Sequence, residues 1–172
     1  KLRVQMRSMI RNLQKDLGIT TIYVTHDQEE ALAISDRIAI MNHGEIEQIA
    51  DPETVYKAPN NTFVASFIGT SVFVPAVTQV SQQPETTVIA IEDYTFTVPV
   101  ELEAQQDIQV SVRPEQFLID NEDRGLSGVI EVCTFFGDYW YYEIKLATGQ
   151  TIEVNEYTKE HEYARELGSK VT

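Results

Sequence analysis

The stretch Ile19-Thr20-Thr21-Ile22-Tyr23-Val24-Thr25-His26-Asp27-Gln28 decides how this sequence is interpreted. Its first seven residues are β-branched almost throughout and place apolar side chains on both alternating faces. Such a run predicts a buried strand of the parallel type over residues 19–25. His26 follows at the carboxyl end of that strand, where open α/β sheets place their ligands. A lone histidine at a strand end is a weak signal, because it is more often structural.

Helical and hairpin patterns flank the predicted strand. Residues 1–17 repeat apolar side chains at three- and four-residue spacing, which predicts a helix, and Gly18 follows as a stop signal. Together with the strand they predict an α/β domain. The other expected elements are a helix over residues 28–35, a hairpin over 37–50, and short helices that begin at Pro52 and at Thr62.

From Thr70 onward the pattern changes to short β-rich runs that alternate with turns. This spacing predicts an all-β barrel or sandwich, so we place the domain boundary between residues 69 and 70. The polar stretch from Glu156 to Leu167 is expected to be helical. The expected strands are Val72–Val80, Thr86–Ile91, Tyr94–Val98, Ile108–Val112, Val129–Phe135, Tyr139–Leu146 and Thr151–Val154.

The charge distribution excludes some functions. The 172 residues carry a formal net charge of −14, and residues 51–172 hold seven basic and twenty acidic side chains. An acidic surface repels phosphate backbones, so we expect no binding to nucleic acid. No apolar run reaches the ~18–20 residues of a membrane span, and the start of the chain lacks the pattern of a signal peptide.

Cysteine and histidine give no indication of a metal site or a disulfide. Cys133 is the only cysteine, and we expect it to be buried and inert in a strand. His43 lies in the predicted hairpin turn, and His161 lies in the predicted helical stretch. Neither has partners at a spacing typical of metal ligands, so we expect no metal site.

Residues 19–69 resemble the end of the nucleotide-binding domain of ABC importer ATPases. The resemblance implies that the α/β part is the C-terminal portion of a P-loop-type ATPase domain. It implies that His26 is the switch histidine, which contacts the γ-phosphate of ATP, and that the complete protein uses ATP and magnesium. The matching residues are Ile22 to Gln28, Glu30-Ala31-Leu32, Ser35 to Ile38, Met41, Gly44, Ile46, Gln48, Pro52-Glu53, Tyr56, Pro59, Asn61, Phe63-Val64-Ala65 and Phe67-Ile68-Gly69.

Several parts of such an ATPase are missing from the sequence. There is no G-x-x-x-x-G-K-[ST] phosphate loop, the Walker A motif. The helix at residues 1–17 resembles the one that follows the family's D-loop, so the signature motif and the Walker B strand would lie upstream of it. We therefore expect this polypeptide to be inactive alone and not to bind ATP tightly.

Residues 70–172 resemble the accessory domain called TOBE, which implies a small OB-like barrel that pairs two subunits. Arg113 and Glu115 are candidates to bind a regulatory ligand, with a local ion pair in a turn as the alternative. Residues 139–142 alternate faces in a strand, so some of these aromatic rings lie outward. The residues that carry the resemblance are Val112 to Glu115, Leu126 to Val129, Phe136-Gly137-Asp138 and Gly168 to Val171.

The two resemblances together imply the energy-coupling subunit of an ABC importer, of the group that transports polyamines, ferric iron or sugars. Val72 and Ala50 depart from the usual Asn and Gly, which leaves the substrate open. The implied partners are a second copy of the chain, as a homodimer, and transmembrane permease subunits. The implied location is the cytoplasmic face of the cell membrane. The alternative is a stand-alone regulatory or dimerisation module of a transporter.

Overall fold

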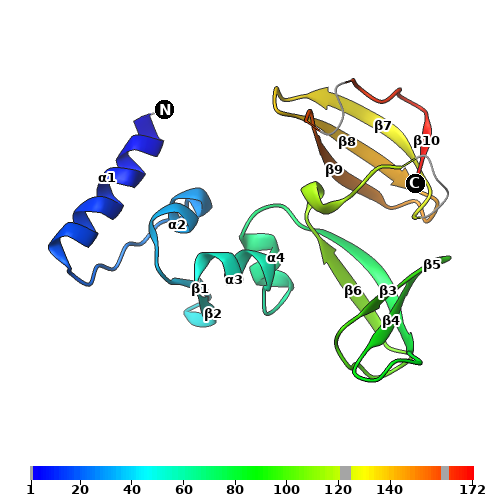
Figure 1. The fold of residues 1–172 in the computed structure, drawn as a ribbon, viewed down its shortest axis with the longest axis horizontal. Helices are drawn as coiled ribbons and strands as arrows, with labels where there is room; N and C mark the ends of the chain where they lie inside the picture. The colour runs from blue at the N-terminus through cyan, green and yellow to red at the C-terminus, as the bar shows by residue number, and fades with distance from the viewer. Residues whose placement is uncertain (1, 121–124, 160–162) are drawn as a thin grey trace. The chain divides into compact units, whose positions relative to one another are not determined.

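The computed structural model describes residues 2–120, 125–159 and 163–172. The chain divides into two compact units, Lys1–Thr70 and Ser71–Thr172, which we call unit 1 and unit 2. Figure 1 labels the helices and strands of both units along the chain. Unit 1 contains most of the helical structure and unit 2 contains eight of the ten strands of the described chain.

Unit 1 contains the helices and the hairpin that the sequence predicts. Local signals set their ends: the Asp51 side chain accepts a hydrogen bond from the Thr54 amide at 3.0 Å, and the Asn61 side chain accepts one from the Val64 amide at 2.9 Å. The elements are α1 Leu2–Leu17, α2 Gln28–Ile34, β1 Ile38–Asn42, β2 Glu45–Ala50, α3 Pro52–Lys57 and α4 Thr62–Phe67.

The core of unit 1 is small and lies among β1, α3 and α4. Five side chains form it, and they are at most 7% exposed: Ile38, Ile40, Val55, Val64 and Ile68. The buried Gln48 of β2 supports this core, because it donates to the Ala58 carbonyl at 3.1 Å and accepts from the Asn60 amide at 2.8 Å. The turn between α3 and α4 is therefore fixed to the hairpin.

The prediction of a buried strand over residues 19–25 is wrong for this structure. The segment forms no helix or strand, and Ile22 and Val24 are 89% and 91% exposed. A strand of the parallel type needs neighbouring strands to accept its backbone hydrogen bonds. Within the described residues of unit 1 the sheet consists of β1 and β2 alone, paired with each other. The β-branched composition by itself does not form a strand.

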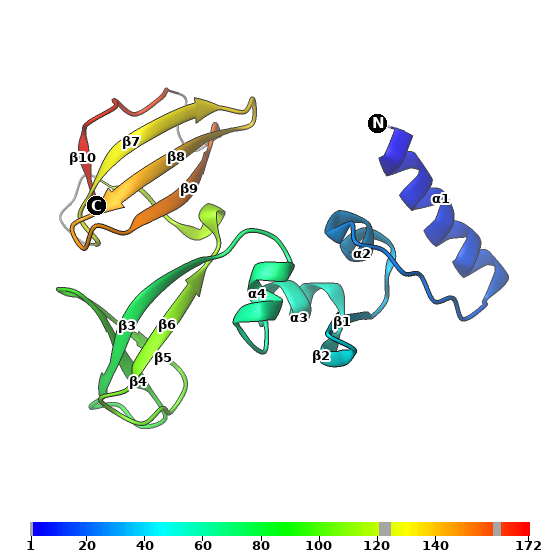
Figure 2. The same cartoon turned by 180° about the vertical axis from the view of Figure 1, so that it is seen from behind.

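Unit 2 consists of two antiparallel four-stranded sheets, in the orders β5-β4-β3-β6 and β10-β7-β8-β9. Figures 1 and 2 show the two sheets from opposite sides. The strands are β3 Val72–Val80, β4 Thr87–Ile91, β5 Tyr94–Val98, β6 Asp107–Val112, β7 Gly128–Phe135, β8 Tyr139–Leu146, β9 Thr151–Tyr157 and β10 Lys170–Val171, with the 3-10 turn η1 at Pro114–Gln116.

A single hydrophobic core joins the two sheets of unit 2. Ile89 of the first sheet and Ile130, Tyr142 and Val154 of the second are each at most 2% exposed. The burial along β4 alternates strictly between buried and half-buried positions, as expected for a strand with one face on a core. The prediction that this part of the chain is all-β is confirmed.

The prediction of a helix from Glu156 to Leu167 is wrong. Strand β9 continues to Tyr157, and the described residues 163–167 are not helical. The strand continues because Ile152, Val154 and Glu156 alternate as buried positions, and Glu156 has an ion-pair partner inside the unit. Cys133 lies in β7 as expected but is only partly buried, and burial raises the pKa of its thiol. His161 lies outside the described residues.

Candidate functional site

His26 lies at a bend between the extended segment 19–25 and α2, with its side chain exposed. Hydrogen bonds fix the backbone directly after it. The Asp27 amide donates to Thr25 Oγ1 at 2.9 Å, and Asp27 Oδ1 accepts from the Glu30 amide at 3.0 Å, which caps α2. Thr25 Oγ1 in turn donates to Glu30 Oε2 at 3.0 Å. The ring of His26 thus projects from an ordered turn.

Two arginines of α1 form ion pairs with the acidic residues that follow His26. Arg7 lies 3.4 Å from Asp27 and 3.0 Å from Glu29, and Arg3 lies 3.7 Å from Asp27. The Arg7 side chain is only 12% exposed. The pKa of Asp27 is lowered, chiefly because its carboxylate accepts the Glu30 amide and also because Arg7 and Arg3 are close. Asp27 is therefore a charged anchor for α1.

A third arginine holds the other end of α2. Arg11 donates to the carbonyl oxygens of Ile34 and Ser35 at 2.8 and 3.2 Å, and to Asp36 Oδ1 at 3.2 Å. These are carbonyls that the end of a helix leaves without intrahelical partners. Helix α1 therefore contacts both ends of α2 through polar groups. Its apolar residues are exposed in the described chain: Leu2, Val4, Met6, Met9, Ile10, Leu13 and Leu17.

The exposed histidine faces an open space. A hollow of about 890 Å³ is lined by the segment 19–25, by His26, and by residues of α1, α2 and β1. Its wall combines the apolar side chains of Ile22 and Val24 with polar groups near the His26 turn. The imidazole can donate a hydrogen bond to an anionic oxygen, or accept a hydrogen bond from a donor, without breaking an existing one.

The structure places Arg113 and Glu115 together at the end of β6, in unit 2. Arg113 is 5% exposed, and its NH1 donates to Ser71 Oγ at 2.6 Å. Its backbone amide donates to Gln116 Oε1 at 2.9 Å, which closes the η1 turn. Glu115 is half-buried within the same turn and is also engaged in contacts. A role of this pair in ligand binding stays a prediction.

Of the aromatic residues of β8, Tyr142 is buried, whereas Tyr139, Trp140 and Tyr141 are half-buried. Tyr142 is fully buried, and its hydroxyl accepts a hydrogen bond from the Arg165 amide at 3.1 Å. Tyr139 stacks on Phe136 with ring centroids 5.4 Å apart. The ring centroids of Trp140 and Phe135 lie 4.6 Å apart, and Phe135 is 55% exposed. An exposed aromatic patch therefore surrounds the turn between β7 and β8.

Alkaline pH is expected to destabilise unit 2 through Tyr141. Burial, together with Glu153 and Glu143, raises the pKa of Tyr141 to about 12, whereas a tyrosine in an unfolded chain has a pKa of about 10. The folded state therefore holds the phenol proton more tightly. Its stabilisation is complete below about pH 10 and is lost as the pH rises toward 12. Denaturant unfolding of Tyr141→Phe, followed by Trp140 fluorescence, should lose stability less steeply over this range.

Tyr163→Phe provides the matched control for that titration, because Tyr163 is 74% exposed. Its unfolding free energy should follow that of the unmodified protein at every pH. Equal slopes for Tyr141→Phe and the unmodified protein between pH 10 and 12 would contradict the assignment.

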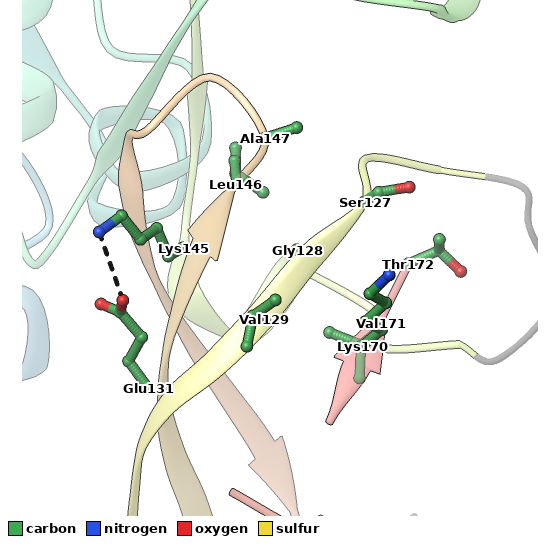
Figure 3. A pocket seen from close by; sticks show the side chains of 10 residues that line it. All are labelled: Ser127, Gly128, Val129, Glu131, Lys145, Leu146, Ala147, Lys170, Val171 and Thr172. Carbon is green, nitrogen blue, oxygen red and sulfur yellow. Dashed lines mark ion pairs between the residues drawn. The ribbon is translucent and has the colours of Figure 1, made fainter. Parts of the chain in front are cut away.

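A second hollow, of about 910 Å³, lies on unit 2 beside β7, β8 and β10 (Figure 3). Its wall offers the Ser127 and Thr172 side chains and two lysines, Lys145 and Lys170. Lys145 Nζ lies 3.5 Å from Glu131 Oε1, so one of the two positive charges is compensated within the wall. The hydroxyl and ammonium groups of this wall could bind a polar molecule, but they do not indicate which one.

Among the described residues, no group of three or more His, Cys, Asp or Glu side chains is placed to hold a metal ion. No helix in that part of the chain is both long and apolar enough to cross a membrane.

Comparison with known proteins gives one domain match and a group of relatives. The sequence model of the TOBE domain matches residues 110–172. An Fe(3+) ions import ATP-binding protein of Fusobacterium nucleatum is 37% identical over 166 residues, covering 92% of this chain and 43% of the relative. A spermidine/putrescine import ATP-binding protein of Clostridium novyi is 44% identical over 154 residues, which cover 84% of this chain and 41% of the relative.

A spermidine/putrescine import ATP-binding protein of Vibrio cholerae is 38% identical over 188 residues, covering 99% of this chain and 48% of the relative. The chain thus spans less than half the length of each of these relatives. The similarity includes unit 1 as well as the TOBE match, since it extends over most of the chain.

Proposed function

We propose that this chain, which matches the TOBE domain and is similar over most of its length to import ATP-binding proteins, forms the C-terminal part of the ATP-binding subunit of an ABC importer. Residues 1–69 are the end of the nucleotide-binding domain, of the P-loop ATPase type, and residues 70–172 are the TOBE-type accessory domain. In the complete subunit, hydrolysis of ATP with magnesium drives import. The subunit works as a homodimer with transmembrane permease subunits at the cytoplasmic face of the membrane. The names of the relatives favour ferric iron or a polyamine as the transported substrate.

The exposure of His26 on a fixed turn is the observation that carries the proposal. The turn is held by Thr25, by the cap of α2 and by Arg7, while the imidazole itself is exposed. A group that stabilises charge in phosphoryl transfer needs a fixed backbone and a ring that can reach the phosphate. The held backbone and the exposed ring of His26 support its assignment as the switch histidine for the γ-phosphate.

The 172-residue chain alone should bind ATP poorly. A phosphate loop supplies backbone amides and a lysine that hold the phosphates, and this sequence contains no such loop. Calorimetric titration of the chain with ATP and magnesium should therefore show no binding in the micromolar range. Reading the gene upstream of Lys1 should reveal a phosphate loop, a signature motif and an Asp-Glu strand in frame. Micromolar binding, or an upstream sequence without these motifs, would favour the stand-alone regulatory module.

A further inference from the structure

Gln28 links the His26 turn to a residue 41 positions later. It is the first residue of α2 and follows the cap residue Asp27. Its Oε1 accepts a hydrogen bond from the Gly69 amide at 2.7 Å in a partly buried position. This is a short distance for an N–H···O bond. The contact therefore joins two segments that the sequence places far apart.

The Gly69 end of this bond is well anchored. Ile68, directly before it, is 1% exposed and donates its amide to the Val64 carbonyl at 3.0 Å, which closes α4. Gly69 has a φ of +76°, a conformation that residues with a side chain rarely adopt. Thr70 follows as the last residue of unit 1. The amide that Gln28 binds thus lies at the exit of the unit, on a backbone fixed by the core.

The two residues after His26 are consequently held by different elements. Asp27 is paired with Arg3 and Arg7 of α1, and Gln28 is bonded to the end of α4. Arg3 and Arg7 restrain the turn through Asp27. The Gly69 amide restrains it through Gln28.

We propose that Gln28 is a positioning residue that fixes the His26 turn against the end of α4. Through the Gln28–Gly69 hydrogen bond, a displacement of the His26 turn reaches Gly69 and Thr70, and a displacement at Gly69 reaches His26. In the complete ATPase this bond carries the state of the γ-phosphate to the exit of unit 1. That last role rests on the proposed function, whereas the coupling of the two segments does not.

The coupling can be measured in the 172-residue chain without any nucleotide. In Gln28→Ala the Gly69 amide should exchange its hydrogen roughly five- to tenfold faster, as loss of one net hydrogen bond predicts. The NMR signals of the His26 backbone and imidazole should shift in the same variant. Gln28→Glu keeps an oxygen acceptor, so its Gly69 exchange should stay within about twofold of the unmodified rate. Gln5→Ala, on the exposed surface of α1, is the matched control and should change neither signal.

A double substitution tests whether the two ends act through one bond. Gly69→Ala strains the backbone at φ +76° and should shift the His26 signals as Gln28→Ala does. The double variant should shift the His26 signals no further than either single variant, because substitutions at two residues that act through one bond do not have additive effects. Additive shifts, unchanged His26 signals in Gln28→Ala, or a Gln28→Glu variant that behaves like Gln28→Ala would each overturn the proposal.

In the complete ATPase, Gln28→Ala should lower kcat with little change in the KM for ATP, and Gln28→Glu should restore it. The two proposals fail separately. If His26→Ala left ATP hydrolysis intact while the NMR coupling held, the switch role of His26 would be wrong and the coupling would stand. If hydrolysis depended on His26 while the NMR signals were uncoupled, only the role of Gln28 would be wrong.

Discussion

Replacing His26 by alanine in the complete subunit is expected to lower kcat for ATP hydrolysis by about 100-fold or more. The imidazole is exposed and stands on a turn fixed by Thr25 and Asp27, so the substitution removes a functional group without removing a packing contact. The KM for ATP should change far less than kcat, because the phosphate loop supplies most of the binding. Steady-state hydrolysis by the purified subunit measures both constants.

His43→Asn is the matched control for this experiment. His43 lies in the turn between β1 and β2 with a φ of 48°, a conformation that asparagine tolerates well. It is exposed like His26 but lies outside the proposed site, so hydrolysis should remain within about twofold. An equal loss in the two variants, or no loss in His26→Ala, would rule out the switch role.

The elements of unit 1 that the sequence predicts correctly are those with local signals. Asp51 and Pro52 begin α3, and Asn61 caps α4, through contacts that span only three residues. The strand over 19–25 has no such local basis. Its β-branched side chains favour an extended backbone. A strand also needs neighbouring strands to pair with, and composition does not show whether these are present.

In unit 2 the alternation of side chains predicts strands well but fails where polar residues are buried. The polar stretch from Glu156 to Leu167 predicts a helix. The structure instead buries the Glu156 side chain at an inward position of β9. Only the pairing with Arg165, which lies nine residues further along the chain, makes that position acceptable for a carboxylate.

The sequence predicts the candidate site only in part. His26 follows from the resemblance, but its supports on α1 were missed. Arg3, Arg7, Arg11 and Lys15 recur every four residues and form a basic stripe on the helix. That stripe, set against the acidic residues around the start of α2, is the signal that could have indicated the contact. The bond from Gln28 to Gly69 has no counterpart in local sequence, because its ends lie 41 positions apart in the chain.

Removing the Arg165 side chain is expected to destabilise unit 2 by roughly 3 kcal/mol, since breaking a buried ion pair leaves a charge without compensation. Arg165 and Glu156 have side chains only 12% and 10% exposed, with Arg165 NH2 2.7 Å from Glu156 Oε1. Arg165 also donates to the Ile119 carbonyl at 2.8 Å. Thermal unfolding followed by the fluorescence of Trp140, the only tryptophan, should shift down by more than about 10 °C in Arg165→Ala.

Lys145→Ala tests whether burial is the cause of that loss. The pair of Lys145 with Glu131 is 53% and 44% exposed, and exposed pairs contribute at most about 1 kcal/mol. Its melting temperature should fall by only a few degrees. Replacing both buried partners, in Arg165→Met with Glu156→Leu, should recover much of the stability that Arg165→Ala loses, because no unpaired carboxylate remains. A double variant as unstable as Arg165→Ala would contradict this account and assign the loss to packing of the arginine stem.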